Sequence, residues 1–275
     1  MLIDCHIHYR GDRSELKTFM REVERLDMKI CLIGSAAPHL GDCAPNGAVA
    51  QALDDYPGLL CGFAHVPLGR GGTPNDVERR FEQGFRGIKF IWPADHYDAD
   101  EYLPVYAKCA ELGMVCLFHT GMVGPARPRE KGVGTKASSR FMRPVDIDMI
   151  AREFLNLKII IAHLGIPWYN EGAMLLRLHR NVYSDLAGSG IWGYIKPELL
   201  REWLDLNGVE TVPPDPRKQF YSKLVYGSDA YTCWPHMLQP ALDGYKRLMD
   251  SLGIADPVRA GIFGGTVAGL LDNES

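Results

Sequence analysis

Strand-like and helix-like segments alternate along the whole chain, and this order limits the fold more than any other feature. Short apolar runs typical of β-strands lie near residues 2–8, 29–35, 59–67, 86–91, 114–119, 158–164, 182–187 and 223–228. Segments with the 3.6-residue periodicity of amphipathic helices follow them, near 14–27, 46–56, 74–83, 100–112, 145–155, 170–180, 197–206 and 236–252. Several runs, such as 159–161, are continuously apolar, as expected of parallel strands that are buried on both faces.

Eight β–α units in 275 residues predict an α/β fold, a (β/α)8 TIM barrel. The composition is 46% hydrophobic and 23% charged, which is typical of a globular chain with a large core. Because such barrels use about 250 residues, we expect a single domain over residues 1–275. The C-terminal ends of all barrel strands surround one mouth, where active sites lie.

Charge and hydropathy set expectations about partners and location. The net charge is −4 and no basic cluster suggests affinity for nucleic acid or a membrane surface, so we expect neither partner. The start of the chain lacks the positive region of a signal peptide, and no apolar stretch approaches the roughly 20 residues of a membrane span. The 7 cysteines form no CxxC pair and suit reduced thiols, which indicates a cytoplasmic protein. Because soluble enzymes commonly self-associate, we expect a homo-oligomer.

Two histidines end the first predicted strand, in the sequence Asp4-Cys5-His6-Ile7-His8. Side chains alternate between the faces of a strand, so His6 and His8 project from the same face and can bind one metal ion. The same alternation turns the Cys5 thiol away from the two imidazoles. Such a short motif also occurs in proteins without a metal. Whether it binds a metal here depends on the residues at the ends of the other strands.

Ionisable residues stand at the ends of several later strands. Lys89 ends the fourth, His119 the fifth and His163 the sixth, and Asp229 follows the eighth. A barrel brings these side chains around one mouth, and burying them together is costly unless a metal ion binds them. The sequence therefore predicts a metal site. We expect Asp185, at the end of the seventh strand, to orient a ligand histidine or the substrate.

Taken in order, these motifs resemble those of the amidohydrolase superfamily, in the amidohydrolase-related branch that includes aminocarboxymuconate-semialdehyde decarboxylase, γ-resorcylate decarboxylase and lactone hydrolases. The resemblance covers the whole chain and rests on the strand-one HxH, the strand-five histidine, Ala-His-Leu-Gly at 162–165 and Gly-Ser-Asp at 227–229. It implies that His163 and Asp229 are catalytic, His163 by activating water or polarising the substrate and Asp229 by moving the proton. It also implies that the metal ligands are His6, His8, His119 and Asp229.

The resemblance leaves two points open. Phosphotriesterase-like members carry a carboxylated lysine where Lys89 stands, and a modified Lys89 would let His119 and His163 share a second metal. We expect one metal and an unmodified Lys89; Zn²⁺ suits imidazole and carboxylate ligands, with Mn²⁺ as the alternative. The segment 264–269 lacks the Asn and Arg that many relatives have there, which leaves the subfamily open.

The predicted activity is hydrolysis of a small substrate that is carboxylated or cyclic, such as a lactone, ester or amide. A metal with an open coordination position lowers the pKa of water toward about 7 and polarises carbonyl groups. The alternative is non-oxidative decarboxylation of an aromatic or muconate-type acid, because fold does not determine the reaction. A third reading is a metal-binding protein without catalysis, against which the complete ligand set argues.

A basic loop at 120–144 suggests how the substrate is held. It carries Arg127, Arg140 and Arg143 among other cations, and arginine binds carboxylates with two parallel hydrogen bonds. A solvated surface loop is the competing interpretation. Further cations and aromatic side chains near the strand ends complete the predicted contacts to an anionic substrate: Arg10, Lys89, Trp92, Arg127, Arg140, Arg143, Trp168 and Tyr231.

Overall fold

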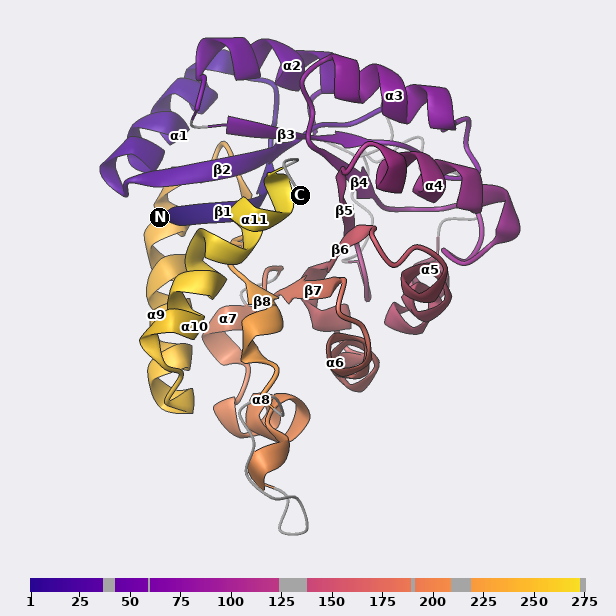
Figure 1. The fold of residues 1–275 in the computed structure, drawn as a ribbon. Helices are drawn as coiled ribbons and strands as arrows, with labels where there is room; N and C mark the ends of the chain where they lie inside the picture. The colour runs from indigo at the N-terminus through magenta and orange to yellow at the C-terminus, as the bar shows by residue number, and fades with distance from the viewer. Residues whose placement is uncertain (37–42, 59, 124–137, 189–190, 209–218, 273–275) are drawn as a thin grey trace.

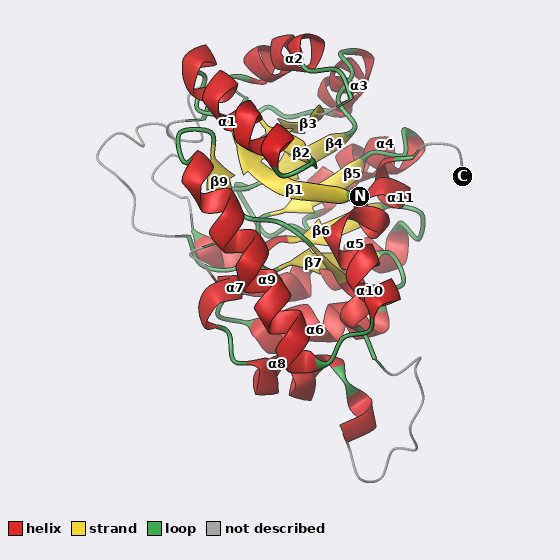
Figure 2. Cartoon of the chain, turned by 90° about the vertical axis from the view of Figure 1, so that its left-hand side faces the viewer, coloured by secondary structure: helices red, strands yellow, loops and turns green. Residues whose placement is uncertain are grey.

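A computed structural model of the chain describes residues 1–36, 43–58, 60–123, 138–188, 191–208 and 219–272. In this part, parallel strands form a barrel with helices on its outside (Figure 1 and Figure 2). The strands pair in the order β8-β7-β6-β5-β4-β3-β2-β1-β9, so those consecutive in the chain lie side by side. The predicted TIM-barrel fold is confirmed. The strands are β1 (Leu2–His8), β2 (Met28–Ile33), β3 (Leu60–His65), β4 (Gly87–Phe90), β5 (Val115–Phe118), β6 (Lys158–Ile161), β7 (Val182–Asp185), β8 (Leu224–Val225) and β9 (Ala230–Tyr231).

The eighth barrel position is occupied by two short strands instead of the single strand predicted at 223–228. β8 pairs with β7, and β9 pairs with β1 on the other side. Between them, the carbonyl of Tyr226 accepts a hydrogen bond from the Cys5 amide at 3.0 Å, and the Asp229 amide donates to the His6 carbonyl at 2.9 Å. These bonds close the barrel while the backbone leaves the regular ladder at residues 227–229, because Asp229 has a left-handed φ of 59°.

The longer helices start and end inside the predicted ranges or within one residue of them. Three short helices, α7, α10 and α11, were not predicted, because 4 to 6 residues are too few to show a helical period. α11 lies across the N-terminal end of the barrel in Figure 1. The helices are α1 (Arg13–Arg25), α2 (Asn46–Asp55), α3 (Pro74–Glu82), α4 (Leu103–Glu111), α5 (Ile147–Glu153), α6 (Tyr169–Leu178), α7 (Ile191–Tyr194), α8 (Pro197–Leu204), α9 (Leu238–Leu252), α10 (Asp256–Ala260) and α11 (Thr266–Leu271).

Two apolar layers explain why the strands read as continuous hydrophobic runs. One layer fills the barrel interior and includes Cys31, Val115 and Ile160. The other lies between the strands and the helices and includes Ile88 and Phe90. Most strands contribute side chains to both layers, as parallel strands covered by helices do. None of the helices in the described part of the chain is long and apolar enough to cross a lipid bilayer.

A β-bulge in β1 sets the direction of the two histidines. Asp4 pairs with Ile30 of β2, but Ile7 pairs with Leu32, so three steps on β1 match two on β2. Cys5 therefore belongs to the barrel interior, directly before His6, whose ring faces the mouth of the same barrel. The expectation that alternation turns Cys5 away from the histidines is wrong, because the bulge interrupts the alternation at this point.

Candidate metal centre

Three side chains converge at the C-terminal mouth of the barrel. His6, His8 and Asp229 each offer a ligand atom, and these atoms all lie within 4.8 Å of one another. Nε2 of His8 is 3.0 Å from Oδ1 of Asp229, and Nε2 of His6 is 3.4 Å from the same oxygen. Both histidines come from the end of β1, and Asp229 comes from the connection between β8 and β9.

The backbone around Asp229 is held by a buried carboxyl group. Oδ1 of Asp4 accepts hydrogen bonds from the backbone amides of His6 and Ser228, each at 3.1 Å. Asp229 itself has left-handed backbone angles, which are costly for a residue with a side chain and which gather at functional sites. Asp4 thus ties the strand that carries the histidines to the turn that carries Asp229.

Asp185, at the end of β7, orients two histidines. Its Oδ2 accepts a hydrogen bond from Nδ1 of His6 at 2.8 Å, and its Oδ1 accepts from the backbone amide of His163 at 2.7 Å. With Nδ1 of His6 donating, the lone pair of that ring lies on Nε2, the atom that faces Asp229. The expected contact between Asp185 and a candidate ligand is present.

His119 and His163 form a second pair beside this group. Nε2 of His163 lies 3.3 Å from Nδ1 of His119. Among the described residues, Nε2 of His119 is buried and has no hydrogen-bond partner, which is a costly state for a polar atom unless something binds it. His163 adopts a left-handed φ of 65°, and the ring is accommodated by Gly188, where a Cβ atom would come within 2.5 Å of its Nδ1.

Lys89 places a cation against the histidines. Its side chain is completely buried at the end of β4, and Nζ lies 3.1 Å from Nε2 of His6. Burial lowers the pKa of Lys89 to about 8, against the opposing effect of the Asp229 and Asp185 carboxylates. The mouth of the barrel therefore combines imidazole nitrogens, carboxylates and one amine within hydrogen-bond distances.

The protonation of His6 and His119 favours metal binding, whereas His8 carries a proton next to Asp229. Burial lowers the pKa of both His6 and His119 well below the usual range, so both imidazoles are neutral, as metal ligands must be. Burial would raise the pKa of Asp229, but His6 and the hydrogen bond to His8 hold it below its usual value. For His8, burial is the largest effect and lowers the pKa, but the hydrogen bonds to Asp229 and Cys43 and the Asp229 charge together outweigh it and raise the pKa to about 9.

The donor set fits a divalent metal. His6, His8 and Asp229 present two imidazole nitrogens and a carboxylate oxygen, which suits Zn²⁺ and is compatible with Mn²⁺. The unsatisfied Nε2 of His119 is one further donor near the group, although it lies outside the compact triplet. His8 holds a proton next to the Asp229 carboxylate. This proton supplies the positive charge that a bound metal ion would supply in its place.

Two side chains pack against His8. The ring of Tyr231, a predicted substrate contact, stacks on it with centroids 5.0 Å apart. Sγ of Cys43 lies 3.7 Å from Nδ1 of His8. This contact was not predicted from the sequence. Cys43 comes from the connection after β2, and no periodicity or motif in that stretch could have indicated its place.

The other predicted substrate contacts are spread around the rim. Arg10 and Trp92 follow β1 and β4, and both are half-buried. The Arg143 guanidinium forms an ion pair with Glu171 and lies 4.9 Å from the ring centre of Trp168. Arg140 is exposed and lies over the ring of Phe141 at 4.4 Å. Arg127 lies outside the described residues, as do the other cations of the loop between residues 124 and 137.

Comparisons with known proteins show which solved structures share this fold. Among solved structures, the chain is similar to an uncharacterised TIM-barrel protein from Bordetella bronchiseptica, with 15% identity and a TM-score of 0.69 over 98% of both chains. It is also similar to a probable 2-pyrone-4,6-dicarboxylic acid hydrolase from Acinetobacter baumannii, with 14% identity and a TM-score of 0.62 over 98% of both chains. 5-Carboxyvanillate decarboxylase from Sphingomonas paucimobilis gives 13% identity and a TM-score of 0.62 over 98% of both chains.

At these identities the likeness is one of fold, and the family assignment rests on a different finding. A comparison with curated proteins gave no match. A protein-family model described as Amidohydrolase matches residues 3–272, which is almost the whole chain. The motifs at the ends of β1, β5 and β6 and after β8 are those that had suggested the same relationship. The chain therefore belongs to the amidohydrolase family.

Proposed function

We propose that this chain is a metal-dependent hydrolase that acts on a small carboxylated or cyclic substrate, such as a lactone, ester or amide. The observation that carries the proposal is the convergence of His6, His8 and Asp229 at the mouth of the barrel. We assign one Zn²⁺ to the site, with Mn²⁺ as the alternative, and we keep His119 as the fourth ligand. When bound, such an ion supplies Lewis acidity that activates water and polarises a carbonyl group.

Asp229 is the residue to which we assign proton transfer. Its carboxylate stays ionised because His6 and His8 hold its pKa down, so it can accept a proton from the attacking water and deliver it to the leaving group. His163 is assigned to stabilise the negative charge that develops on the substrate oxygen. The Asp185 carboxylate holds the backbone of His163 in place for this role.

Lys89 is assigned to an anionic group of the substrate. It is a buried cation within 3.1 Å of a candidate ligand, so a carboxylate that reached it would lie beside the reacting centre. Burial of such a cation without a fixed partner is costly, and an anionic substrate would offset that cost. The alternative is a carboxylated Lys89, with a second metal shared by His119 and His163. Measuring the number of metal ions per chain distinguishes the two.

Decarboxylation of an aromatic or muconate-type acid is the second candidate function. The Lys89 ammonium beside the ligand group favours it, because this arrangement would also hold a carboxylate against the metal. Structural relatives include 2,6-dihydroxybenzoate decarboxylase from Rhizobium, at 13% identity and a TM-score of 0.62, besides the decarboxylase from Sphingomonas paucimobilis. With lactones and aromatic acids as substrates in ¹⁸O-labelled water, label in the product without CO₂ indicates the hydrolase, and release of CO₂ indicates the lyase.

Metal content per chain tests the site itself. We expect about one Zn²⁺ per chain in protein purified without chelator, and loss of that metal in His6→Ala. His236→Ala is the matched control, because His236 is an exposed histidine outside the group. Two ions per chain would support the carboxylated Lys89, and a chain that binds no metal even after reconstitution would contradict the proposal.

A further inference from the structure

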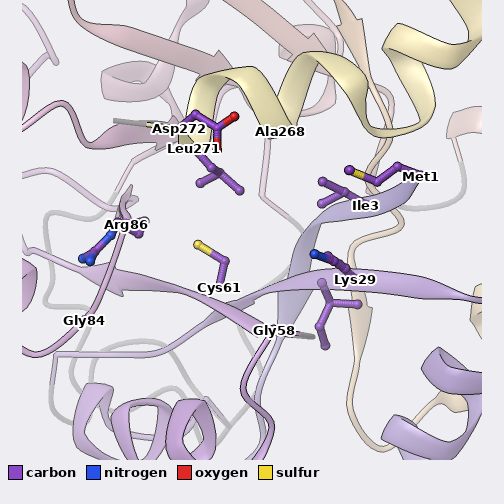
Figure 3. A pocket seen from close by; sticks show the side chains of 11 residues that line it. Met1, Ile3, Lys29, Gly58, Cys61, Gly84, Arg86, Ala268, Leu271 and Asp272 are labelled. Carbon is purple, nitrogen blue, oxygen red and sulfur yellow. The ribbon is translucent and has the colours of Figure 1, made fainter. Parts of the chain in front are cut away.

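A cavity of about 340 Å³ opens at the end of the barrel opposite the candidate metal centre. Most of its lining residues precede or begin strands, and α11 covers it (Figure 3). Cys61 of β3 lies in this lining, and its sulfur points into the cavity. The charged residues in its lining are Lys29, Arg86 and Asp272. Cys61 is partly exposed, and solvent access is one of the two properties that make a cysteine susceptible to oxidation.

A second thiol lies directly beside Cys61. Cys31 of β2 is paired in register with Cys61 across the two parallel strands. Neighbouring strands lie about 4.8 Å apart, and disulfides join Cα atoms about 4.4–6.8 Å apart, so the pair is within reach of a bond. The two thiols are in hydrogen-bond contact, and this contact together with burial raises the pKa of Cys31. Cys31 is fully buried, so the cavity is the route to the pair.

We propose that Cys61 is a site of oxidation by peroxides and that Cys31 resolves the product to a disulfide. The Cys61 thiolate attacks one oxygen of hydrogen peroxide, the O–O bond breaks and hydroxide leaves, which yields a sulfenic acid. The Cys31 sulfur then attacks the sulfenic sulfur, the S–O bond breaks, and the hydroxyl group leaves as water with the Cys31 proton. The two sulfurs together lose two electrons, and one peroxide molecule is reduced.

A second thiol pair in the same chain provides an internal control. Cys109 and Cys116 are also in hydrogen-bond contact, but both are completely buried and neither lines the cavity. We therefore expect this pair to stay reduced while Cys61 and Cys31 react. Parallel oxidation of both pairs would contradict the proposal, because it would mean that peroxide reaches the thiols through unfolding.

Peptide mapping by mass spectrometry tests the proposal on the full chain treated with hydrogen peroxide. Digestion before aspartate cuts at Asp27, Asp42 and Asp54–Asp55, so Cys31, Cys43 and Cys61 fall on separate peptides. We expect a peptide pair that links Cys31 to Cys61 with the loss of two hydrogen atoms, and its separation by dithiothreitol. In Cys31→Ser, Cys61 stops at the sulfenic acid and is trapped by dimedone, and Cys61→Ser forms no linked pair.

Cys109→Ser is the matched control variant, and it keeps the link between Cys31 and Cys61. Two results would overturn the assignment. One is a Cys61 that stays reduced while the partly exposed Cys43 and Cys233 are oxidised. The other is a link from Cys31 to Cys5, the neighbouring buried thiol of the barrel interior, in place of the link to Cys61.

Discussion

Oδ2 of Asp185 lies 2.8 Å from Nδ1 of His6, although the two residues are 179 positions apart in the chain. The other oxygen of the same carboxylate holds the backbone of His163. One buried side chain at the end of β7 therefore sets the orientation of a candidate metal ligand and the position of a candidate catalytic residue. In metal sites, a carboxylate behind a ligand histidine fixes the ring and raises its basicity.

Replacing Asp185 should weaken metal binding without removing a ligand. Asp185→Asn keeps the size of the side chain but loses the charge that supports His6, and we expect metal affinity to fall about 10–100-fold. Competition with a chelator of known affinity measures the change. Asp250→Asn, which alters an exposed carboxylate on α9, should leave the affinity unchanged. Equal affinities for Asp185→Asn and the unmodified chain would show that the contact does not support the metal.

Asp229→Asn should impair catalysis more than binding. The amide cannot accept the proton that we assign to the carboxylate, so kcat should fall about 10²–10⁴-fold, with a smaller effect on KM. The assay uses protein whose metal content has been restored and confirmed, because Asp229 is also a candidate ligand. Near-normal kcat in the metal-loaded variant would refute proton transfer by this residue.

Gly188→Ala tests the placement of His163. A Cβ atom at Gly188 would come within 2.5 Å of Nδ1 of His163, and the glycine has a φ of +81°, so the ring has to move. We expect a clear loss of kcat with metal content retained. Gly193→Ala is the control, because its Cβ atom would meet nothing within 4 Å. If both variants were fully active, the position of the His163 ring would not matter for turnover.

Lys89→Met should affect anionic substrates selectively. Methionine fills the buried space without the ammonium group, so KM for a carboxylated substrate should rise about tenfold or more, as expected when a charged hydrogen bond is lost. A neutral substrate of the same shape should be little affected. The exposed Lys246 on α9 offers a matched control, and Lys246→Met should leave both KM values within about twofold. An unchanged KM in Lys89→Met would remove Lys89 from substrate binding.

Removal of the metal should lower thermal stability. A ligand that binds only the folded chain stabilises it by about 2.7 kcal/mol at a hundredfold excess over its Kd. We therefore expect treatment with EDTA followed by desalting to lower Tm, and addition of Zn²⁺ to restore it. His6→Ala should start from the lower Tm and respond to neither step. A Tm that is independent of metal in the unmodified chain would argue against occupancy of the site.

Much of the fold and the convergence of three candidate ligands could be predicted from the sequence. The alternation of strands and helices depends on local periodicities of about 2 and 3.6 residues, which survive in the order of apolar side chains. The residues at the strand ends follow from the same pattern, because a parallel barrel gathers all its C-terminal ends at one mouth. The sequence therefore predicted that His6, His8 and Asp229 lie close together, and they do so in the structure.

Only the tertiary structure determined how these residues meet. The bulge in β1, the contact between Asp185 and His6 and the split of the eighth strand depend on register between segments that are distant in the chain. The position of Cys43 beside His8, and the pairing of Arg143 with Glu171, depend on how connections pack over the barrel. A local pattern carries no information on such contacts, because the free energy that selects them comes from burial and hydrogen bonding between elements that meet only in the folded chain.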